Sequence, residues 1–361
     1  MKISIIGNNL TSLILAKSLA NKNVNTQIFH KKKTYNTKSN RCIAITHENL
    51  KFLDKNFVIP KNLINPVNEI SILNEQNKND EILNFKKKQN LIFLIKNNDL
   101  IKVLKKSLKK IKFREIKNSK FYENLLNKSK NELIINCENN NFYNKNFFNK
   151  KFYKDYKSVA YTFLLKHKKI QNHKATQIFT KYGPLAFLPL SNFQTSVVFS
   201  IYKNKKLINN YEIVKIVKKY NKLYSITGVS KVEKADLIFE SARKYYYKNI
   251  LLFGNNLHRI HPLAGQGFNM TLRDLKILVK EICKLKSLGL PINENFNKHF
   301  ENKTKPYNLL YSNGINLIEN IFRIDSVIKN KISNKIPILI NKNQKLKNIL
   351  MEFADKGFNL N

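Results

Sequence analysis

The sequence of 361 residues contains few cysteines and no long apolar run. The cysteines, Cys42, Cys137 and Cys283, lie far apart and show no Cys-x-x-Cys or Cys/His spacing. A disulfide scaffold and a cysteine-built zinc site are therefore excluded, and a reducing compartment is expected. No stretch approaches the roughly 20 uncharged apolar residues that a membrane span requires. These absences predict a soluble cytoplasmic protein.

Acidic residues are also scarce, because Asp+Glu number 24 against 66 for Lys+Arg, which gives a formal net charge of +42. Almost all of the basic residues are lysines, and they are spread over nearly every segment. Base readout and bidentate phosphate contacts favour arginine, so this distribution predicts no specific nucleic-acid partner. We interpret the lysines as solvated surface, with polyanion binding and attraction to anionic lipid head groups as alternatives.

The chain does contain the apolar material of a folded protein. Hydrophobic residues make up 42% of it and aromatic residues 11%, which excludes disorder throughout. Its length predicts one large domain or two to three interleaved domains with a sizeable core.

The first 30 residues predict a strand, a helix and a second strand. β-branched residues fill 2–6, apolar residues at helical spacing fill 11–22, and a second β-like run covers 24–29. Gly7 follows the first strand directly. In such a βαβ opening, a dinucleotide pyrophosphate meets a helix N-terminus.

The middle of the chain predicts two kinds of structure. Residues 91–95 and 132–136 indicate short buried strands, and 99–111 indicates a helix between them. Between 156 and 201, successive strand-like runs with a turn at 182–184 predict the antiparallel sheet of a second domain.

A glycine-rich loop follows the buried strand predicted at 249–254. Gly265, Gln266 and Gly267 then begin a long helix, and the chain beyond 293 is expected to be mostly helical and basic. Glycine at these positions lets the backbone approach a planar ligand, while free amides and the helix dipole favour an anionic atom. A reduced flavin suits this position. A glycine-rich turn that merely begins a helix is the alternative.

Several blocks, in the same order along the chain, resemble one family of flavoproteins. The stretch LLFGNNLHRIHPLAGQGFNMTLRD resembles the pattern GDAAH-x-x-HP-x-AGQG-x-N-x-G-x-x-D of the FAD-dependent aromatic hydroxylases of ubiquinone biosynthesis. These enzymes are a branch of the 4-hydroxybenzoate hydroxylase-like flavoprotein monooxygenases. The other blocks that resemble the family are IIGNNLTSLILAKSLA, NRCIAITHENLKFL, KNNDLIKVL, ATQIFTKYGPLAFLPL and LKNILMEFADKGF.

The resemblance implies an α/β fold in which a Rossmann-like FAD-binding domain is interleaved with a β-sheet substrate domain, followed by a C-terminal helical region. The FAD-binding domain would comprise 1–70, 92–150 and 240–290. The substrate domain would comprise 71–91 and 151–239, and the helical region 291–361.

The resemblance also implies a reaction. The family uses FAD, O2 and NAD(P)H to hydroxylate an aromatic ring through a flavin C4a-hydroperoxide, here on a polyprenylated ubiquinone precursor. It requires no side-chain nucleophile and no metal, so no catalytic residue is assigned. A prenylated substrate and a lysine-rich surface favour peripheral association with the inner face of the membrane or with a protein assembly of ubiquinone biosynthesis.

Matching positions imply the residues that would contact the ligands. Gly7 would lie beside the pyrophosphate, Arg41 would lie along the cofactor, and 262–269 would hold the isoalloxazine through backbone groups. The implied cofactor-binding residues are Gly7, Ser12, His30, Arg41, Gly254, Asn255, Pro262, Gly265, Gln266, Gly267, Phe268 and Asn269. The implied substrate-lining residues are Phe187, Pro189 and His261.

The nucleotide site departs from the family pattern at five places. Asn9 and Ser12 replace glycines, and the Asn9 side chain obstructs the approach of the pyrophosphate. His30 replaces the acid that accepts ribose hydroxyls, Glu138-Asn139 replaces an Asp-Gly pair, and Asn255 replaces the Asp beside the ribityl chain. Either FAD binds more weakly through a compensated site, or the chain is a non-catalytic relative that acts as a binding or assembly component of the same pathway.

Three further features have simple structural interpretations. His258 and His261 lack a third ligand, so we interpret them as loop packing or ligand contacts instead of a metal site. Cys42, beside Arg41, is interpreted as a buried apolar residue instead of a thiolate. The basic C-terminal region is interpreted as packing over the FAD domain, with a helix on a membrane surface as the alternative.

Overall fold

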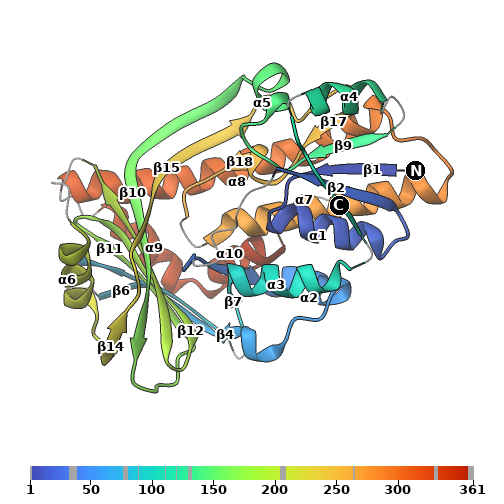
Figure 1. Ribbon diagram of the computed structural model, residues 1–361. Coiled ribbons are helices and arrows are strands. Elements are labelled where there is room, and N and C mark those ends of the chain that lie inside the picture. The colour runs from blue at the N-terminus through green and yellow to red at the C-terminus, as the bar shows by residue number, and fades with distance from the viewer. Residues whose placement is uncertain are drawn as a thin grey trace.

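The computed structural model describes residues 2–31, 39–75, 80–87, 89–109, 111–118, 120–128, 132–203, 209–262, 265–328 and 332–356. Within these residues, a six-stranded and a nine-stranded sheet lie side by side, and a three-stranded sheet lies near them (Figure 1). The chain passes between the two large sheets several times, so segments distant in sequence form each of them.

Strand β1 (Lys2–Ile6) lies inside the six-stranded sheet and pairs in parallel with β2 (Asn25–His30) and β9 (Leu133–Asn136). Helices α1 (Leu10–Ala20) and α7 (Gln266–Ser287) contact each other and share one apolar core with these strands. The predicted βαβ opening is therefore confirmed. The other strands of this sheet are β8 (Lys112–Glu115), β16 (Tyr246–Tyr247) and β17 (Ile250–Leu252).

The nine-stranded sheet is mostly antiparallel. Strand β12 (Gly183–Ser191) pairs with β11 (Lys174–Thr180) and β13 (Gln194–Tyr202), so the predicted second sheet is confirmed. The predicted turn begins one residue earlier, at 181–182, because Gly183 and Pro184 already belong to β12. The other strands are β5 (Glu69–Asn74), β6 (Asp80–Lys86), β10 (Lys151–His167), β14 (Ile226–Val229), β15 (Glu233–Ala242) and β18 (His258–Arg259).

The second sheet is covered differently on its two faces. Helix α6 (Asn210–Tyr220) covers the outer face, at the far side from the first sheet in Figure 1. The three-stranded sheet, formed by β3 (Cys42–Thr46), β4 (Asn65–Val67) and β7 (Ile92–Lys96), packs on the other face. The shorter helices are α2 (His47–Asn56), α3 (Asn97–Ser107), α4 (Lys120–Lys128) and α5 (Phe142–Phe147).

Three helices follow at the C-terminal end, namely α8 (Glu294–Ile328), α9 (Ile332–Lys342) and α10 (Gln344–Lys356). Helix α8 contacts β16 of the first sheet and packs Tyr311 and Ile315 against Phe179 of the second, so it joins the two. The predicted C-terminal helical region is confirmed, except that 329–331 and 357–361 lie outside the described residues. Across the described helices, none is both long and apolar enough to cross a bilayer.

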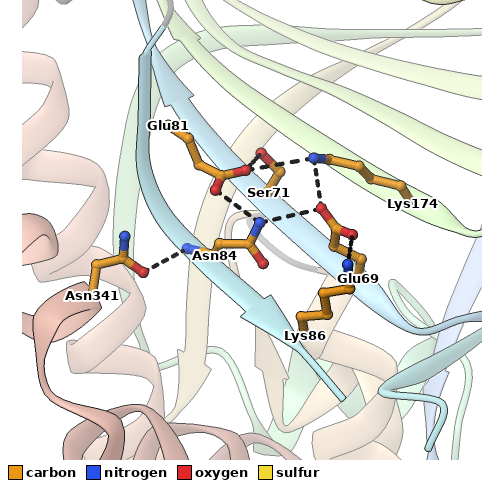
Figure 2. A network of polar contacts seen from close by, with 7 residues as sticks. All are labelled: Glu69, Ser71, Glu81, Asn84, Lys86, Lys174 and Asn341. Carbon is orange, nitrogen blue, oxygen red and sulfur yellow. Dashed lines mark hydrogen bonds and ion pairs between the residues drawn. The ribbon is translucent and has the colours of Figure 1, made fainter. Parts of the chain in front are cut away.

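Figure 2 shows how a C-terminal helix covers the edge strand β6. The backbone N–H of Asn84 donates to Asn341 Oδ1 of α9 at 3.2 Å. Lys174 of β11 pairs with Glu69 at 2.6 Å and with Glu81 at 3.5 Å, which ties three strands together. An edge strand that carries charges and lies under a helix is protected against pairing with another chain.

The predicted α/β fold class, with interleaved sheets and C-terminal helices, is confirmed. Strands β1 and β2 enter the first sheet, β5 and β6 the second, β9 the first, and β10 to β15 the second again. The domain boundaries given above stay a prediction.

Candidate functional site

The turn after β1 is the first of the predicted cofactor-binding positions. Gly7 is buried and has a φ of 120°, which residues with a side chain rarely adopt. A Cβ atom on Gly7 would lie 3.4 Å from backbone atoms of Cys137 and Glu138, which follow β9. Glycine is needed here because of this backbone conformation, since contacts at 3.4 Å would be ordinary van der Waals distances.

Asn9 and Ser12 close the first turn of α1 on itself. The Ser12 N–H donates to Asn9 Oδ1 at 3.1 Å, and the Asn9 N–H donates to Ser12 Oγ at 2.9 Å, which forms a capping box. Asn9 Nδ2 also donates to the carbonyl oxygen of Cys137 at 2.6 Å. Asn9 thus caps the helix and bridges the ends of β1 and β9, and the predicted site residue Ser12 completes the capping box.

The turn after β17 packs directly on this helix start. Gly254 opens a short 3-10 turn (Gly254–Asn256) with a φ of 66°, and a Cβ atom there would lie 2.9 Å from Thr11 Cγ2. Asn255 is exposed, whereas Asn256 is buried. The predicted residues that the structure brings together here are Gly7, Ser12, Gly254 and Asn255.

A buried cluster of four asparagines supports the same turn. Asn136 Nδ2 donates to Asn144 Oδ1 at 2.9 Å, and Asn141 Nδ2 donates to Asn136 Oδ1 at 2.7 Å. Asn144 Nδ2 donates to Asn256 Oδ1 at 2.9 Å, which links the ends of β9 and β17. Asparagine is so common in this chain that the sequence offered no signal for the cluster.

Two predicted residues lie outside this group. His30 ends β2, is half-buried, and its Nδ1 lies 3.0 Å from the carbonyl oxygen of Lys31. The two lysines that follow in sequence lie outside the described residues. Arg41 is exposed just before β3, where its carbonyl oxygen accepts from the N–H of Asn97 at 3.0 Å.

The start of α7 forms a second group of predicted residues. Gly265 has a φ of 62°, and its N–H donates to the carbonyl oxygen of Pro262 at 3.1 Å. Within the described part of the chain no side chain caps this helix, and its first turn has no acidic residue, so its free amides favour a negative charge. A Cβ atom on Gly265 would lie 3.0 Å from Ala44 Cβ. Leu263 and Ala264, within the predicted segment, lie outside the described residues.

Asn269 is 1% exposed and anchors α7 to its neighbours. Its Oδ1 accepts from the Thr46 N–H at 3.1 Å and from Asn49 Nδ2 at 2.9 Å, and its Nδ2 donates to the carbonyl oxygen of Ala44 at 2.9 Å. The side chain is fully engaged by β3 and α2. A contact from Asn269 to a ligand would therefore have to come from its backbone.

The three residues between Gly265 and Asn269 differ in their surroundings. Gln266 is 8% exposed, and its Oε1 has no hydrogen-bond partner among the described residues. Gly267 faces Ile260, whose nearest atom would lie 3.5 Å from an added Cβ. Phe268 packs against the core of the first sheet.

Two predicted substrate-lining residues, Phe187 and Pro189, lie on the face of the second sheet that α6 covers. Phe187 is 3% exposed and packs beneath α6, with its ring centroid 5.9 Å from that of Tyr224. Pro189 shares this face because successive side chains alternate along a strand. Ala186 and Leu188 take the opposite face, where Leu188 packs towards β3 and β7, and the substrate contacts of Phe187 and Pro189 stay a prediction. Both faces of β12 are apolar, so the sequence could not distinguish them.

His261 is 1% exposed and packs against Tyr156 of β10. Its ring meets Tyr156 edge to face, with centroids 5.0 Å apart, and the Tyr156 hydroxyl donates to Asn316 Oδ1. Neither ring nitrogen has a hydrogen-bond partner among the described residues. Burial, together with the nearby Lys154 cation, lowers the pKa of His261 to about 3. Burial raises the pKa of the neighbouring Glu319 carboxyl on α8.

The remaining interpretations concern His258 and Cys42. His258 Nε2 lies 3.0 Å from Asp274 Oδ2, which also accepts from Asn308 Nδ2 at 3.0 Å, so His258 holds its loop to α7. Over the described ranges, no group of three or more His, Cys, Asp or Glu side chains is arranged to hold a metal ion. Cys42 is half-buried, less than predicted, but desolvation raises the pKa of its thiol to about 11, so it is no thiolate.

Comparisons with known proteins point to one group of enzymes. No protein-family model matches the chain. The chain is 27% identical over 144 residues, 38% of its length, to the ubiquinone hydroxylase UbiM of Neisseria meningitidis, and 25% identical over 162 residues, 43% of its length, to the ubiquinone hydroxylase UbiL of Rhodospirillum rubrum. It is 31% identical over 119 residues, 31% of its length, to the 3-demethoxyubiquinol 3-hydroxylase of Escherichia coli. The chain spans about a third of the length of these relatives, namely 31%, 38% and 30%.

Solved structures cover the chain almost completely. The p-nitrophenol 4-monooxygenase PnpA of Pseudomonas putida superimposes with a TM-score of 0.74 and 10% identity over 98% of the chain and 97% of that enzyme. PqsL, a probable FAD-dependent monooxygenase of Pseudomonas aeruginosa, gives 0.69 and 9% over 94% and 98%. At these identities the comparison establishes the fold alone.

Proposed function

Because the chain is a relative of the ubiquinone-biosynthesis hydroxylases and has the fold of flavin-dependent monooxygenases, we propose that it is an FAD-dependent hydroxylase of a polyprenylated ubiquinone precursor. The reaction consumes one O2, one NAD(P)H and one proton. One oxygen atom enters the aromatic C–H bond as a hydroxyl group, and the other leaves as water. The nicotinamide supplies two electrons and becomes NAD(P)+.

The observation that carries this proposal is the left-handed Gly265 at the uncapped start of α7. The N-terminal amides of this helix of 22 residues favour the negative charge of a reduced flavin. Gly265 contacts Ala44 of β3, and Met270 packs against Phe179 of β11. A ligand held here lies between the two sheets, beside the face of β12 that carries Leu188.

The residues present fit a flavin at its ring end and depart from one at its nucleotide end. At the ring end, the amides at the start of α7 have no side-chain cap among the described residues, and the unpartnered oxygen of Gln266 can accept a hydrogen bond from a ring N–H. At the nucleotide end, Gly7 and Gly254 keep their turns, but Asn9 lies over the helix start. A bound flavin would supply oxygen activation, and the protein would bind it, orient it and exclude water.

For the substrate, we assign the face of the second sheet that lies opposite α6. Ala186 and Leu188 on β12 provide half-buried apolar contacts for an aromatic ring. Gln177 of β11 is paired with Ala186 in the register, so its amide lies on the same face and can hydrogen-bond a ring hydroxyl. These side chains orient the ring and exclude water, and none of them is a nucleophile.

The proposal is tested by flavin binding and oxygen incorporation. The full chain is dialysed to equilibrium against FAD and then supplied with NAD(P)H, isotopically labelled O2 and a short-chain prenylated phenol. We expect a perturbed visible spectrum of the bound flavin and a product that gains one labelled oxygen atom. A chain that is folded by circular dichroism but binds no flavin contradicts the proposal and favours the non-catalytic relative.

Gly265→Ala is expected to weaken FAD binding by roughly tenfold, because an added methyl group strains a left-handed turn and meets Ala44. Gly289→Ala is the matched control. Gly289 is also left-handed, with a φ of 67°, but it follows the other end of α7 and has no atom within 4 Å of an added Cβ. Both variants should lose thermal stability, and only Gly265→Ala should lose flavin affinity in the dialysis measurement. Equal affinities would contradict the assigned site.

We also propose that the chain is cytoplasmic and binds the inner face of an anionic membrane through α10. Leu346, Ile349 and Leu350 are 44%, 60% and 39% exposed, and their spacing places them on one helix face. Lys345 is exposed beside them, and the chain carries a net charge of +42. An apolar helix face with surrounding lysines is suited to an anionic lipid surface, in which a prenylated substrate dissolves.

Ile349→Asp is expected to reduce binding to vesicles that contain phosphatidylglycerol by roughly fivefold, because it places a charge in the apolar face. Val58→Asp is the matched control, since Val58 is 83% exposed and lies outside α10. Co-sedimentation with vesicles measures both variants. If both variants lose the same affinity for these vesicles, only the overall charge matters and α10 is not the binding surface. If the chain binds neutral vesicles and not anionic ones, the proposed attraction to anionic lipid is contradicted.

A further inference from the structure

The Asn9 side chain lies between the carboxyl ends of β1 and β9 in the first sheet. Strand β1 has β2 on one side and β9 on the other, so the direction of the strand order changes beside it. In open α/β sheets, ligands bind beyond the carboxyl ends of the strands at such a point. The hydrogen bond of 2.6 Å from Asn9 Nδ2 to the carbonyl oxygen of Cys137 spans this gap.

The same side chain also occupies the start of α1. Asn9 Oδ1 accepts from the Ser12 N–H, the third amide of the helix, at 3.1 Å. A pyrophosphate at a helix start accepts from amides of this kind. The Asn9 amide nitrogen would lie 3.5 Å from a Cβ atom on Gly7, so the amide also covers the glycine turn.

We infer that Asn9 acts as an internal substitute for the pyrophosphate, so that the chain recognises a flavin mainly by its ring and distinguishes poorly between FAD and riboflavin. This inference rests on the proposed function. To reach α1, the phosphates of FAD must displace the two side-chain hydrogen bonds of Asn9. Riboflavin has no phosphate and needs no such displacement. The same two bonds stabilise the flavin-free chain, because they give the helix amide and the strand-end carbonyl a protein partner.

Asn9→Gly therefore has two opposite effects. FAD affinity is expected to rise roughly tenfold, the gain of one charge-assisted hydrogen bond to a phosphate oxygen. Riboflavin affinity should stay within about twofold, because the ring end is unchanged. The Tm of the flavin-free chain should fall, because the capping box and the bond to Cys137 are lost. Flavin fluorescence titration and thermal unfolding of the full chain measure these quantities.

Asn209→Gly is the matched control. Asn209 caps α6 with the same kind of capping box, formed with Glu212, on the outer face of the second sheet. This variant should lower Tm without changing the ratio of FAD to riboflavin affinity. If Asn9→Gly lowers Tm but leaves that ratio unchanged, Asn9 is only a helix cap and the inference is overturned. If neither flavin binds wild type or variant, the proposed function itself fails, and the inference fails with it.

Discussion

Replacement of Asn269 by leucine is expected to lower the free energy of unfolding by about 3 kcal/mol, because it removes a buried amide that joins three elements. The side chain accepts from the Thr46 N–H and from Asn49 Nδ2, and it donates to the carbonyl oxygen of Ala44. Leucine has nearly the same size, so the loss comes from broken hydrogen bonds and not from a cavity. Urea denaturation of the flavin-free chain measures the change.

Asn313→Leu is the control for this prediction. Asn313 is exposed on α8, so its replacement should change the free energy of unfolding by no more than about 0.5 kcal/mol. The comparison separates two roles for Asn269. If Asn269→Leu keeps its stability without flavin and loses flavin affinity, the side chain contacts the cofactor and our assignment as an anchor between α7 and β3 is wrong.

Local patterns were enough to predict β1, α1 and β2. Each of these elements has its own pattern: a run of β-branched residues, a helical spacing of apolar residues and a second β-like run. Each pattern can be recognised without knowing which distant segment packs against it. The start of α7 was equally clear, because Gly265 and Gly267 mark the change from loop to helix. The strongest parts of the prediction were thus the segments whose structure depends on their own sequence.

The face of β12 could not be predicted in this way. Phe187 and Leu188 are both apolar, and only the position of α6, which begins at Asn210, decides which of them lies under a helix. The asparagine cluster is a similar case, because Asn144 and Asn256 are 112 residues apart in sequence. Features that depend on contacts between distant segments leave no local pattern.

Two of the departures from the family pattern at the nucleotide end, Asn9 and Asn255, are asparagines with different surroundings. A carboxylate only accepts hydrogen bonds, whereas an amide both donates and accepts. Asn9 uses both groups within the protein, as Asn269 does at the other end of the site. Asn255, in contrast, is exposed, and its amide stays accessible to a ligand. A change from acid to amide is therefore tolerable at Asn255, while the amide at Asn9 competes directly with a phosphate.

The buried His261 gives the second large effect, a loss of stability towards acid. Its pKa is lowered to about 3, because it is buried beside the Lys154 cation and Tyr156 of β10. As pH falls below about 6.5, the unfolded chain binds a proton on this histidine and the folded chain does not. Stability therefore falls by about 1.4 kcal/mol per pH unit until pH approaches the folded pKa. Glu319 on α8 acts with the opposite sign, since its raised pKa contributes stability that is lost as pH rises.

The difference between wild type and His261→Phe isolates the histidine from Glu319 and other acids. Between about pH 7.5 and about pH 5, the free energy of unfolding of wild type should fall by about 2 kcal/mol more than that of His261→Phe. Urea denaturation at both pH values measures both proteins. If His261→Phe and wild type lose equal stability towards acid, His261 takes up its proton in the folded chain, and the closed packing of Tyr156 against this ring does not persist in solution.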